Sequence, residues 1–385
     1  MRPARANQRI RMTSVCLALT SLPAIAHGTV KFALAYGASC NLCHVTPLGG
    51  SMRNAYGLEE VILGDLPRAG RRASRARGLN ARSNSFLRWG VDVRTQAFWY
   101  DTTSVRTEPL SGIFPMQATA YMNAFAGEAL DFYLAHFLLQ AETEFWVRLT
   151  NKTGMAYARM GRFRPAYGLN LDDHTSYIRG GNPSRLLVPG IPFRQQSFPF
   201  GPFYHGDGTV EAGLYFGDIF LTAHVANPSM IPKFSPTARD AQLGLRMEVI
   251  RSLGGLTIMA GGSYLRERKP IFRGLFTGLN WGRVTLLSEV DWVDNWAGPG
   301  ITSAVAYAEL DVLIRQGWRL FLKWDVHEGS TGPPQTEKDK LSRITLGGEF
   351  FPMPFLELKP QIRFDSDTYT GGETVNLLLQ LHFFY

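Results

Sequence analysis

The chain has 385 residues, of which 19% are charged and 45% are hydrophobic, and its formal net charge at pH 7 is +8. Four of the positive charges lie within the first eleven residues, on Arg2, Arg5, Arg9 and Arg11. Without them the net charge is about +4, and a balance this mild, with no recognisable binding motif, excludes a nucleic-acid-binding protein as the expected class.

The N-terminus carries the pattern of an export signal. The basic residues precede an uncharged apolar stretch, "SVCLALTSLPAIA", which ends in Ala24-Ile25-Ala26. A basic region, a short apolar region and a small-x-small site are typical of a secretory signal peptide. We therefore expect residues 1–26 to be removed. One of the three cysteines, Cys16, lies inside this segment.

The two remaining cysteines stand in "YGASCNLCHVTPLGG", residues 36–50. Cys40 and Cys43, followed directly by His44, form the attachment signature of a c-type haem. A Cys40–Cys43 disulfide and a zinc site compete with this interpretation, but zinc needs four ligands and no second Cys or His pair is present. We predict one covalent haem c in a small cytochrome domain, residues 27–67, with His44 as the proximal iron ligand.

The CxxCH motif does not specify the distal ligand of the haem iron. Met52 is the nearest methionine, and Gly49 and Gly50 before it permit a chain reversal over the haem. Met52 as ordinary packing is the competing interpretation. The sequence is also compatible with an open sixth position, with His27 as the ligand, or with a ligand from the barrel wall such as His136 or His382.

Most of the chain after residue 85 alternates between apolar and polar residues with period two. In the last strand, Leu377, Leu379 and Leu381 share one face, and Asn376, Gln380 and His382 share the other. The same pattern runs through residues 89–94, 283–292, 318–327 and 355–365. Period-two alternation predicts β-strands.

The connections between these strands alternate in length, which favours an outer-membrane barrel over a soluble sandwich. Short turns are expected near Gly127, Asn151, Gly217, Leu253, Trp281, Gln316 and Pro352. Longer connections are expected at 101–115, 164–208, 227–239, 294–301, 328–340 and 366–373. Short periplasmic turns and long outer loops are typical of bacterial outer-membrane proteins.

We therefore predict a membrane all-β fold, an antiparallel outer-membrane β-barrel of about 16 strands over residues 85–385, preceded by the very small cytochrome domain. The barrel would contact outer-membrane lipid. The strand count would be fourteen if Leu130 to Thr150 formed one long strand.

Two further segments, residues 68–84 and 172–174, can each be interpreted as ordinary structure or as a binding site. Residues 68–84 contain six arginines and no acid. They form either a solvated linker or a polybasic tether for anionic lipid, haem propionates or an acidic partner. Asp172, Asp173 and His174 are either a capped turn or transient ligands for Fe(II).

An export signal, one CxxCH motif near the mature N-terminus and a barrel together resemble the fused cytochrome–porin family of bacterial outer membranes. Cys40 and Cys43 match its attachment cysteines and His44 its proximal ligand, with Phe32, Ala33 and Tyr36 upstream. The resemblance implies an extracellular electron donor such as Fe(II), a periplasmic c-type cytochrome as acceptor, and an activity like that of an iron:cytochrome c oxidoreductase.

Three functions follow from this pattern. The first is an electron conduit through the haem. The second is a solute porin with a haem-bearing plug or redox gate, for which "ARMGRFRPAYGLNLDDHTSYIRG" offers an arginine-rich strand and a long constriction loop. The third is a haem-bearing scaffold within a larger surface assembly.

Overall fold

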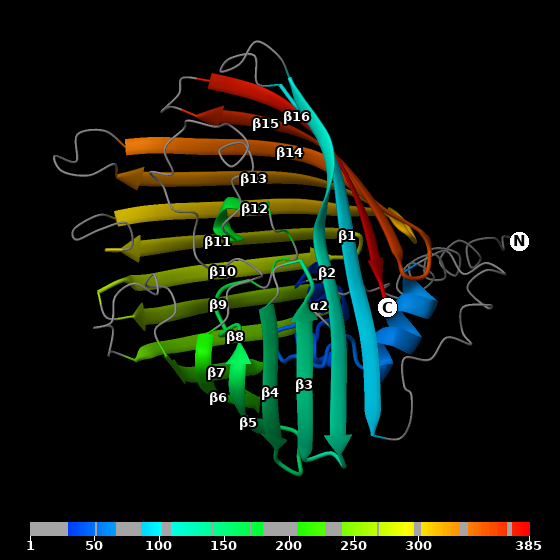
Figure 1. The fold of residues 1–385 in the computed structure, drawn as a ribbon, viewed down its shortest axis with the longest axis vertical. Helices are drawn as coiled ribbons and strands as arrows, with labels where there is room; N and C mark the ends of the chain where they lie inside the picture. Colours follow the sequence, from blue (N-terminus) through cyan, green and yellow to red (C-terminus); the bar gives the residue numbers. More distant parts are fainter. Residues whose placement is uncertain are drawn as a thin grey trace, which may run out of the picture.

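The computed structural model describes residues 30–50, 52–66, 86–101, 109–139, 142–169, 171, 173, 175–179, 206–227, 241–267, 269–295, 302–330, 338–367 and 372–385. The predicted signal peptide (1–26), His27 and the arginine-rich linker (68–84) lie outside these residues. Sixteen strands of the described part close into one antiparallel barrel (Figure 1). The barrel and the strand number of the main prediction are confirmed.

The strands follow one another around the barrel in chain order. They are β1 (Leu87–Tyr100), β2 (Leu110–Ala126), β3 (Leu130–Phe137), β4 (Glu142–Thr150), β5 (Ala156–Phe163), β6 (Gly206–Phe216), β7 (Ile219–Ala226), β8 (Gln242–Leu253), β9 (Leu256–Glu267), β10 (Ile271–Trp281), β11 (Val284–Asp294), β12 (Thr302–Arg315), β13 (Trp318–Ser330), β14 (Lys338–Met353), β15 (Leu356–Asp367) and β16 (Gly372–Phe384).

The last strand closes the barrel against the first. Val93 of β1 pairs with Phe383 of β16, and Val91 exchanges two 2.8 Å backbone hydrogen bonds with the terminal Tyr385. The fourteen-strand count is wrong because Leu130 to Thr150 turns back on itself: Leu130 of β3 pairs with Leu149 of β4.

All seven predicted short turns lie between strands at one end of the barrel, and the longer connections lie at the other. Gly217 and Gly282 adopt positive φ in two of these tight turns, as hairpin turns require. The start of β1 and the end of β16 lie at the same end as the short turns. This end faces the periplasm, because short turns are periplasmic in outer-membrane barrels.

The two faces of the wall separate as predicted. On β16 the outward residues Leu377, Leu379 and Leu381 are 44–48% exposed, whereas the inward Asn376 and His382 are buried. Many of the described inward polar residues are buried and do not face open water, because two segments of the chain pack inside the barrel.

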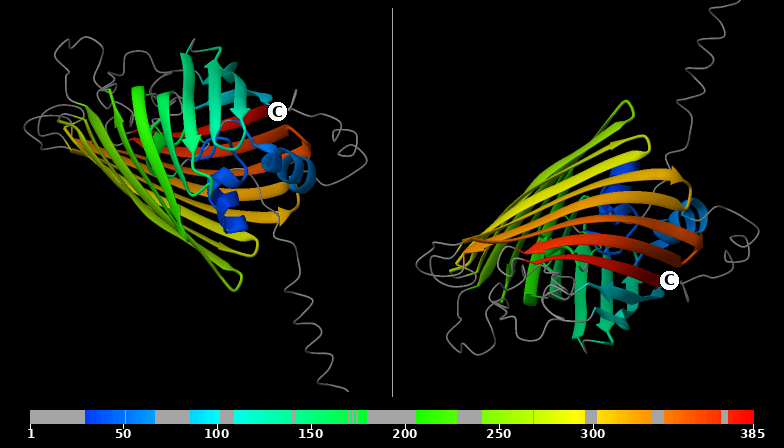
Figure 2. Two further views of the ribbon diagram at one scale, coloured as in Figure 1. Left: turned by 90° about the horizontal axis from the view of Figure 1, so that it is seen from below. Right: turned by 90° about the horizontal axis from the view of Figure 1, so that it is seen from above.

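The first of these segments is N-terminal. It comprises helix α2 (Val30–Tyr36), the 3-10 turn η1 (Cys40–Leu42) and the π-helical segment η2 (Gly57–Asp65). We call residues 30–50 and 52–66 the plug. Figure 2 shows α2 between the walls of the barrel, and η2 lies at the periplasmic mouth against Phe351, Phe355 and Phe384.

The second segment is the start of the β5–β6 connection. Its described residues (164–169, 171, 173 and 175–179), which we call the inward loop, include the 3-10 turn η3 (Tyr177–Arg179). Leu169 and Ile178 pack with Leu34 of α2 in one buried cluster. In the part of the chain that the structure describes, no helix is both long and apolar enough to cross a membrane.

Candidate functional site

The CxxCH motif forms a tight turn inside the barrel. The amides of Cys43 and His44 both donate to the carbonyl of Cys40, at 3.2 and 3.1 Å. Both cysteines are free thiols. Burial raises the pKa of Cys40 to about 12 and that of Cys43 to about 11, so both are protonated at neutral pH.

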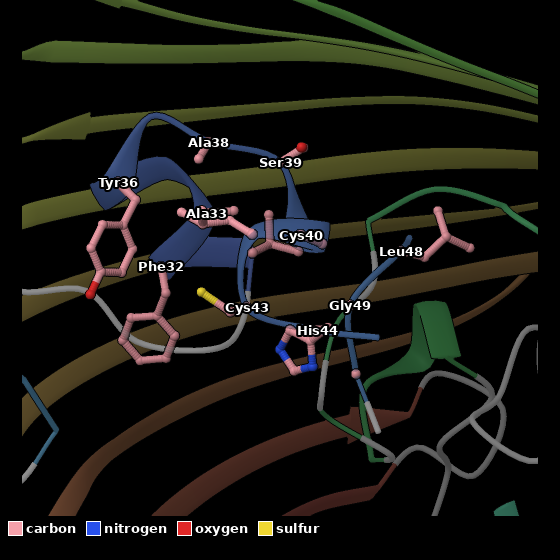
Figure 3. Close-up of a pocket in the computed structure, with 13 residues that line it drawn as sticks. Phe32, Ala33, Tyr36, Ala38, Ser39, Cys40, Cys43, His44, Leu48 and Gly49 are labelled. Atoms are coloured by element: carbon pink, nitrogen blue, oxygen red, sulfur yellow. The ribbon is translucent and has the colours of Figure 1, made fainter. Parts of the chain in front are cut away.

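A pocket opens beside this turn, with about 370 Å³ of empty space that includes space open to the surroundings. Cys40, Cys43 and His44 line it together with apolar side chains from both flanks: Val30, Phe32, Ala33, Tyr36, Leu42 and Leu48. Figure 3 shows Phe32, Cys43 and His44 on the same side of the α2–η1 turn. The structure thus places the three predicted attachment residues around one largely apolar cavity.

A hairpin follows the motif, as the Gly-Gly pair predicts. Gly49 and Gly50 adopt φ of +75° and +68°, in the region that favours glycine. The amide of Val45 then donates to the carbonyl of Met52 at 3.1 Å, and His44 and Arg53 form an isolated antiparallel bridge. The chain reversal therefore brings residues 52–53 back beside the motif.

Asn54 holds this turn against η2, which sequence reasoning missed. Its side-chain amide donates to the carbonyls of Asn41 and Leu42 at 3.0 Å, and its oxygen accepts the amide of Gly57 at 2.9 Å. A β-carbon at Gly57 would lie 2.1 Å from the carbonyl oxygen of Cys43. The sequence offered two signals for this contact: an asparagine ten residues after the motif histidine, and a glycine three residues after that asparagine.

Met52 lies in a different environment from the pocket. Its buried side chain belongs to an apolar cluster with Val45 and barrel residues that include Tyr121, Tyr133 and Trp146. Met52 is not among the residues that line the pocket.

The two barrel histidines predicted as possible distal ligands, His136 and His382, are also absent from the pocket lining. His136 is half-buried and contacts Thr143 at 2.9 Å, on the strand face opposite the buried Tyr133 and Ala135. His382 faces the lumen, where its ring nitrogens lie 2.8 Å from Glu357 and 3.0 Å from Asp92.

Lys31 fixes the plug to the barrel wall. Its ammonium lies 2.7 Å from Glu349, 3.0 Å from Asp311 and 3.5 Å from Glu309, and all four side chains are buried. These carboxylates project from β12 and β14. Buried charges persist when they are paired, so this cluster specifies where α2 lies in the lumen.

The inward loop is fixed in the same way. Arg179 pairs with Glu289 at 2.6 Å, and Asp173 pairs with Lys323 at 2.8 Å. Asp173 also accepts the amide of Thr175 at 2.9 Å, which is the capped turn expected as the ordinary interpretation. Asp172 and His174 lie outside the described residues. Within the described residues no group of three or more His, Cys, Asp or Glu side chains could hold a metal ion.

Comparisons with known proteins support the barrel. No protein-family model and no curated protein matches the chain. Among solved structures, OmpT of Vibrio cholerae matches 79% of this chain and 99% of its own, at 11% identity and a TM-score of 0.53. The anion-selective porin of Comamonas acidovorans matches 78% and 99%, at 11% identity and a TM-score of 0.54. OprB of Pseudomonas putida matches 78% and 94%, at 9% identity and a TM-score of 0.54.

At these identities the likeness concerns the fold. It covers the barrel and says nothing of the plug's chemistry. By fold the chain is a 16-stranded antiparallel β-barrel like those of outer-membrane porins, and it is a protein of the bacterial outer membrane.

Proposed function

We propose that the plug carries one covalent haem c and that the barrel conducts electrons across the outer membrane. The residues fit the group: the two thiols and the imidazole that attachment requires surround one apolar pocket. Cys40 and Cys43 would hold the ring, and His44 would be its proximal ligand. A haem there would supply a one-electron redox centre.

The observation that carries this proposal is the fixed position of the motif in the lumen. The apolar band of an outer-membrane barrel is about 25 Å tall, which separates carriers on the two sides. The plug holds the CxxCH turn inside the barrel, towards the periplasmic mouth where Cys43 packs against the η2 cluster, and Lys31 with its three carboxylates anchors α2 to the wall. An extracellular donor such as Fe(II) and a periplasmic c-type cytochrome are the proposed partners.

The second candidate is a solute channel with a haem-bearing plug or redox gate. The likeness to porins favours it, because the matched barrels include one described as an anion-selective porin. The inward loop lies between β5 and β6, and its described residues narrow the lumen. The buried ion pairs of Lys31 and Arg179 fix both lumenal segments to the wall, which argues against a gate that opens by movement of either segment.

One vesicle experiment separates the two candidates. Purified protein is reconstituted into liposomes that contain a c-type cytochrome, and a membrane-impermeant reductant is added outside. The conduit predicts that the entrapped cytochrome is reduced while entrapped small solutes stay inside. The Cys40→Ala, Cys43→Ala double variant is the control and should give no reduction. Solute release without cytochrome reduction would overturn the conduit and support the channel.

A further inference from the structure

A hollow lies on the outer face of the barrel, across β8, β9, β10 and β11. It encloses about 1120 Å³, including space open to the surroundings. Its lining is mostly apolar and outward-facing: Leu245, Met247, Tyr264, Leu275 and Trp292, together with Gly262. Nothing in the electron-conduit proposal uses this face.

The hollow exists because a glycine interrupts a row of large side chains. Gly262 of β9 pairs with Met247 on one side and Leu275 on the other. Those two side chains are 49% and 62% exposed, whereas Gly262 has none between them. The result is a groove with aliphatic walls, closed towards the outer rim by Tyr264 and Trp292.

Cationic side chains border the groove at its outer end. Arg273 lines it, and Arg266 and Lys269 are exposed at the adjoining end of β9 and the start of the β9–β10 connection. Arg273 pairs with Asp294, the one acid bordering the groove within the described residues. Three cations against one carboxylate leave a local excess of positive charge.

The position of Arg273 along the membrane normal is suitable for contact with a lipid head group. Arg273 and Trp281 stand eight residues apart on β10, which is about 27 Å along a strand. A strand tilt of about 40° reduces this to roughly 21 Å, close to the apolar band of about 25 Å. Since Trp281 lies at the periplasmic end of the strand, Arg273 lies near the outer edge of the apolar band, from which its long side chain can reach the head groups.

We propose that this groove binds a phosphorylated, multiply acylated lipid of the outer leaflet. Its acyl chains lie between Met247 and Leu275 over Gly262, and its phosphate contacts Arg266 and Arg273. Arginine suits this role because its fork of N–H donors matches phosphate oxygens.

Binding of purified lipid A to the detergent-solubilised, full-length protein tests the proposal, with native mass spectrometry as the readout. The Arg266→Gln, Arg273→Gln double variant should bind about tenfold more weakly, a loss of about 1.4 kcal/mol shared between two solvent-exposed ionic contacts. A Gly262→Leu variant, which fills the groove, should also bind more weakly. Dephosphorylated lipid A should bind the parent as weakly as lipid A binds the double variant.

The matched control is Arg251→Gln with Arg283→Gln, two arginines at the periplasmic end, which should leave binding unchanged. Equal binding by the parent, the arginine double variant and the control would overturn the proposal. A change of oligomeric state in Gly262→Leu with unchanged lipid A binding would also overturn it and would assign the groove to contact with a second copy. Neither outcome bears on haem attachment, so the two proposals fail independently.

Discussion

The ammonium of Lys31 lies 2.7 Å from a carboxylate oxygen of Glu349, inside the barrel and more than 300 residues away in the sequence. Two further carboxylates, on Asp311 and Glu309, complete the cluster. This one side chain fastens the N-terminal helix to the wall of the lumen. The plug is therefore a fixed part of the barrel.

Replacing Lys31 should loosen the plug. Lys31→Met removes the shared cation, although each carboxylate keeps a second one, such as Lys359 for Glu349. The cost should therefore lie near the lower end for breaking a buried pair, about 3 kcal/mol. We expect a higher single-channel conductance in planar bilayers. Arg251→Gln, which removes a pair with Asp218 that is more than half exposed, is the control. Equal conductance in all three proteins would contradict the anchoring role.

Asn54 should matter for the shape of the motif. Asn54→Ala removes the hydrogen bonds to the carbonyls of Asn41 and Leu42 and the cap on Gly57, at a cost of about 1–3 kcal/mol. We expect less covalent haem per barrel, measured as pyridine haemochrome against protein concentration. Asn41→Ala, at an exposed position on the same turn, is the matched control. Equal haem content in both variants would argue against this positioning role.

Depth in the membrane should decide the cost of a charge on the lipid face. Leu379→Arg lies near the middle of β16 and should destabilise the barrel by about 2–4 kcal/mol. Val375→Arg faces the same way near the outer end of the strand and should cost about 0–1 kcal/mol. Urea unfolding in lipid vesicles measures both. Similar costs at the two positions would contradict the assigned membrane band.

Met52 as the distal ligand is a proposal that a conservative variant can test. Met52→Leu keeps the apolar volume within the cluster of Tyr121, Tyr133 and Trp146 but removes the sulfur. The proposal predicts loss of the sulfur-to-iron charge-transfer band and a lower reduction potential. An unchanged spectrum and potential would leave Met52 with packing alone.

The barrel could be predicted from sequence because the alternation of apolar and polar residues within each strand shows which residues face outwards and which face inwards. Leu377, Leu379 and Leu381 alternate with Asn376, Gln380 and His382, and the glycine turns mark the hairpins. Each of these signals lies within one short segment of sequence, so it can be recognised without knowledge of the tertiary structure. One inward position, Leu378, is apolar and buried, so even this pattern has an exception.

The position of the plug could not be predicted because its contacts are not local. Lys31 meets carboxylates 280 and 318 residues away, and Asp173 meets Lys323 at a separation of 150 residues. Nothing in the periodicity of β12, β13 or β14 shows which inward charge has a partner from another segment. The CxxCH motif itself was visible, but its enclosure by the barrel was not.

Covalent haem on the plug is the central claim, and a haem-stained denaturing gel tests it most directly. The parent is expressed with the c-type haem maturation machinery and extracted from outer membranes beside the Cys40→Ala, Cys43→Ala variant. Both should show the heat-dependent mobility of a folded barrel. The parent band should stain for haem and the variant band should not. An unstained parent band, or a stained variant band, would contradict attachment at Cys40 and Cys43.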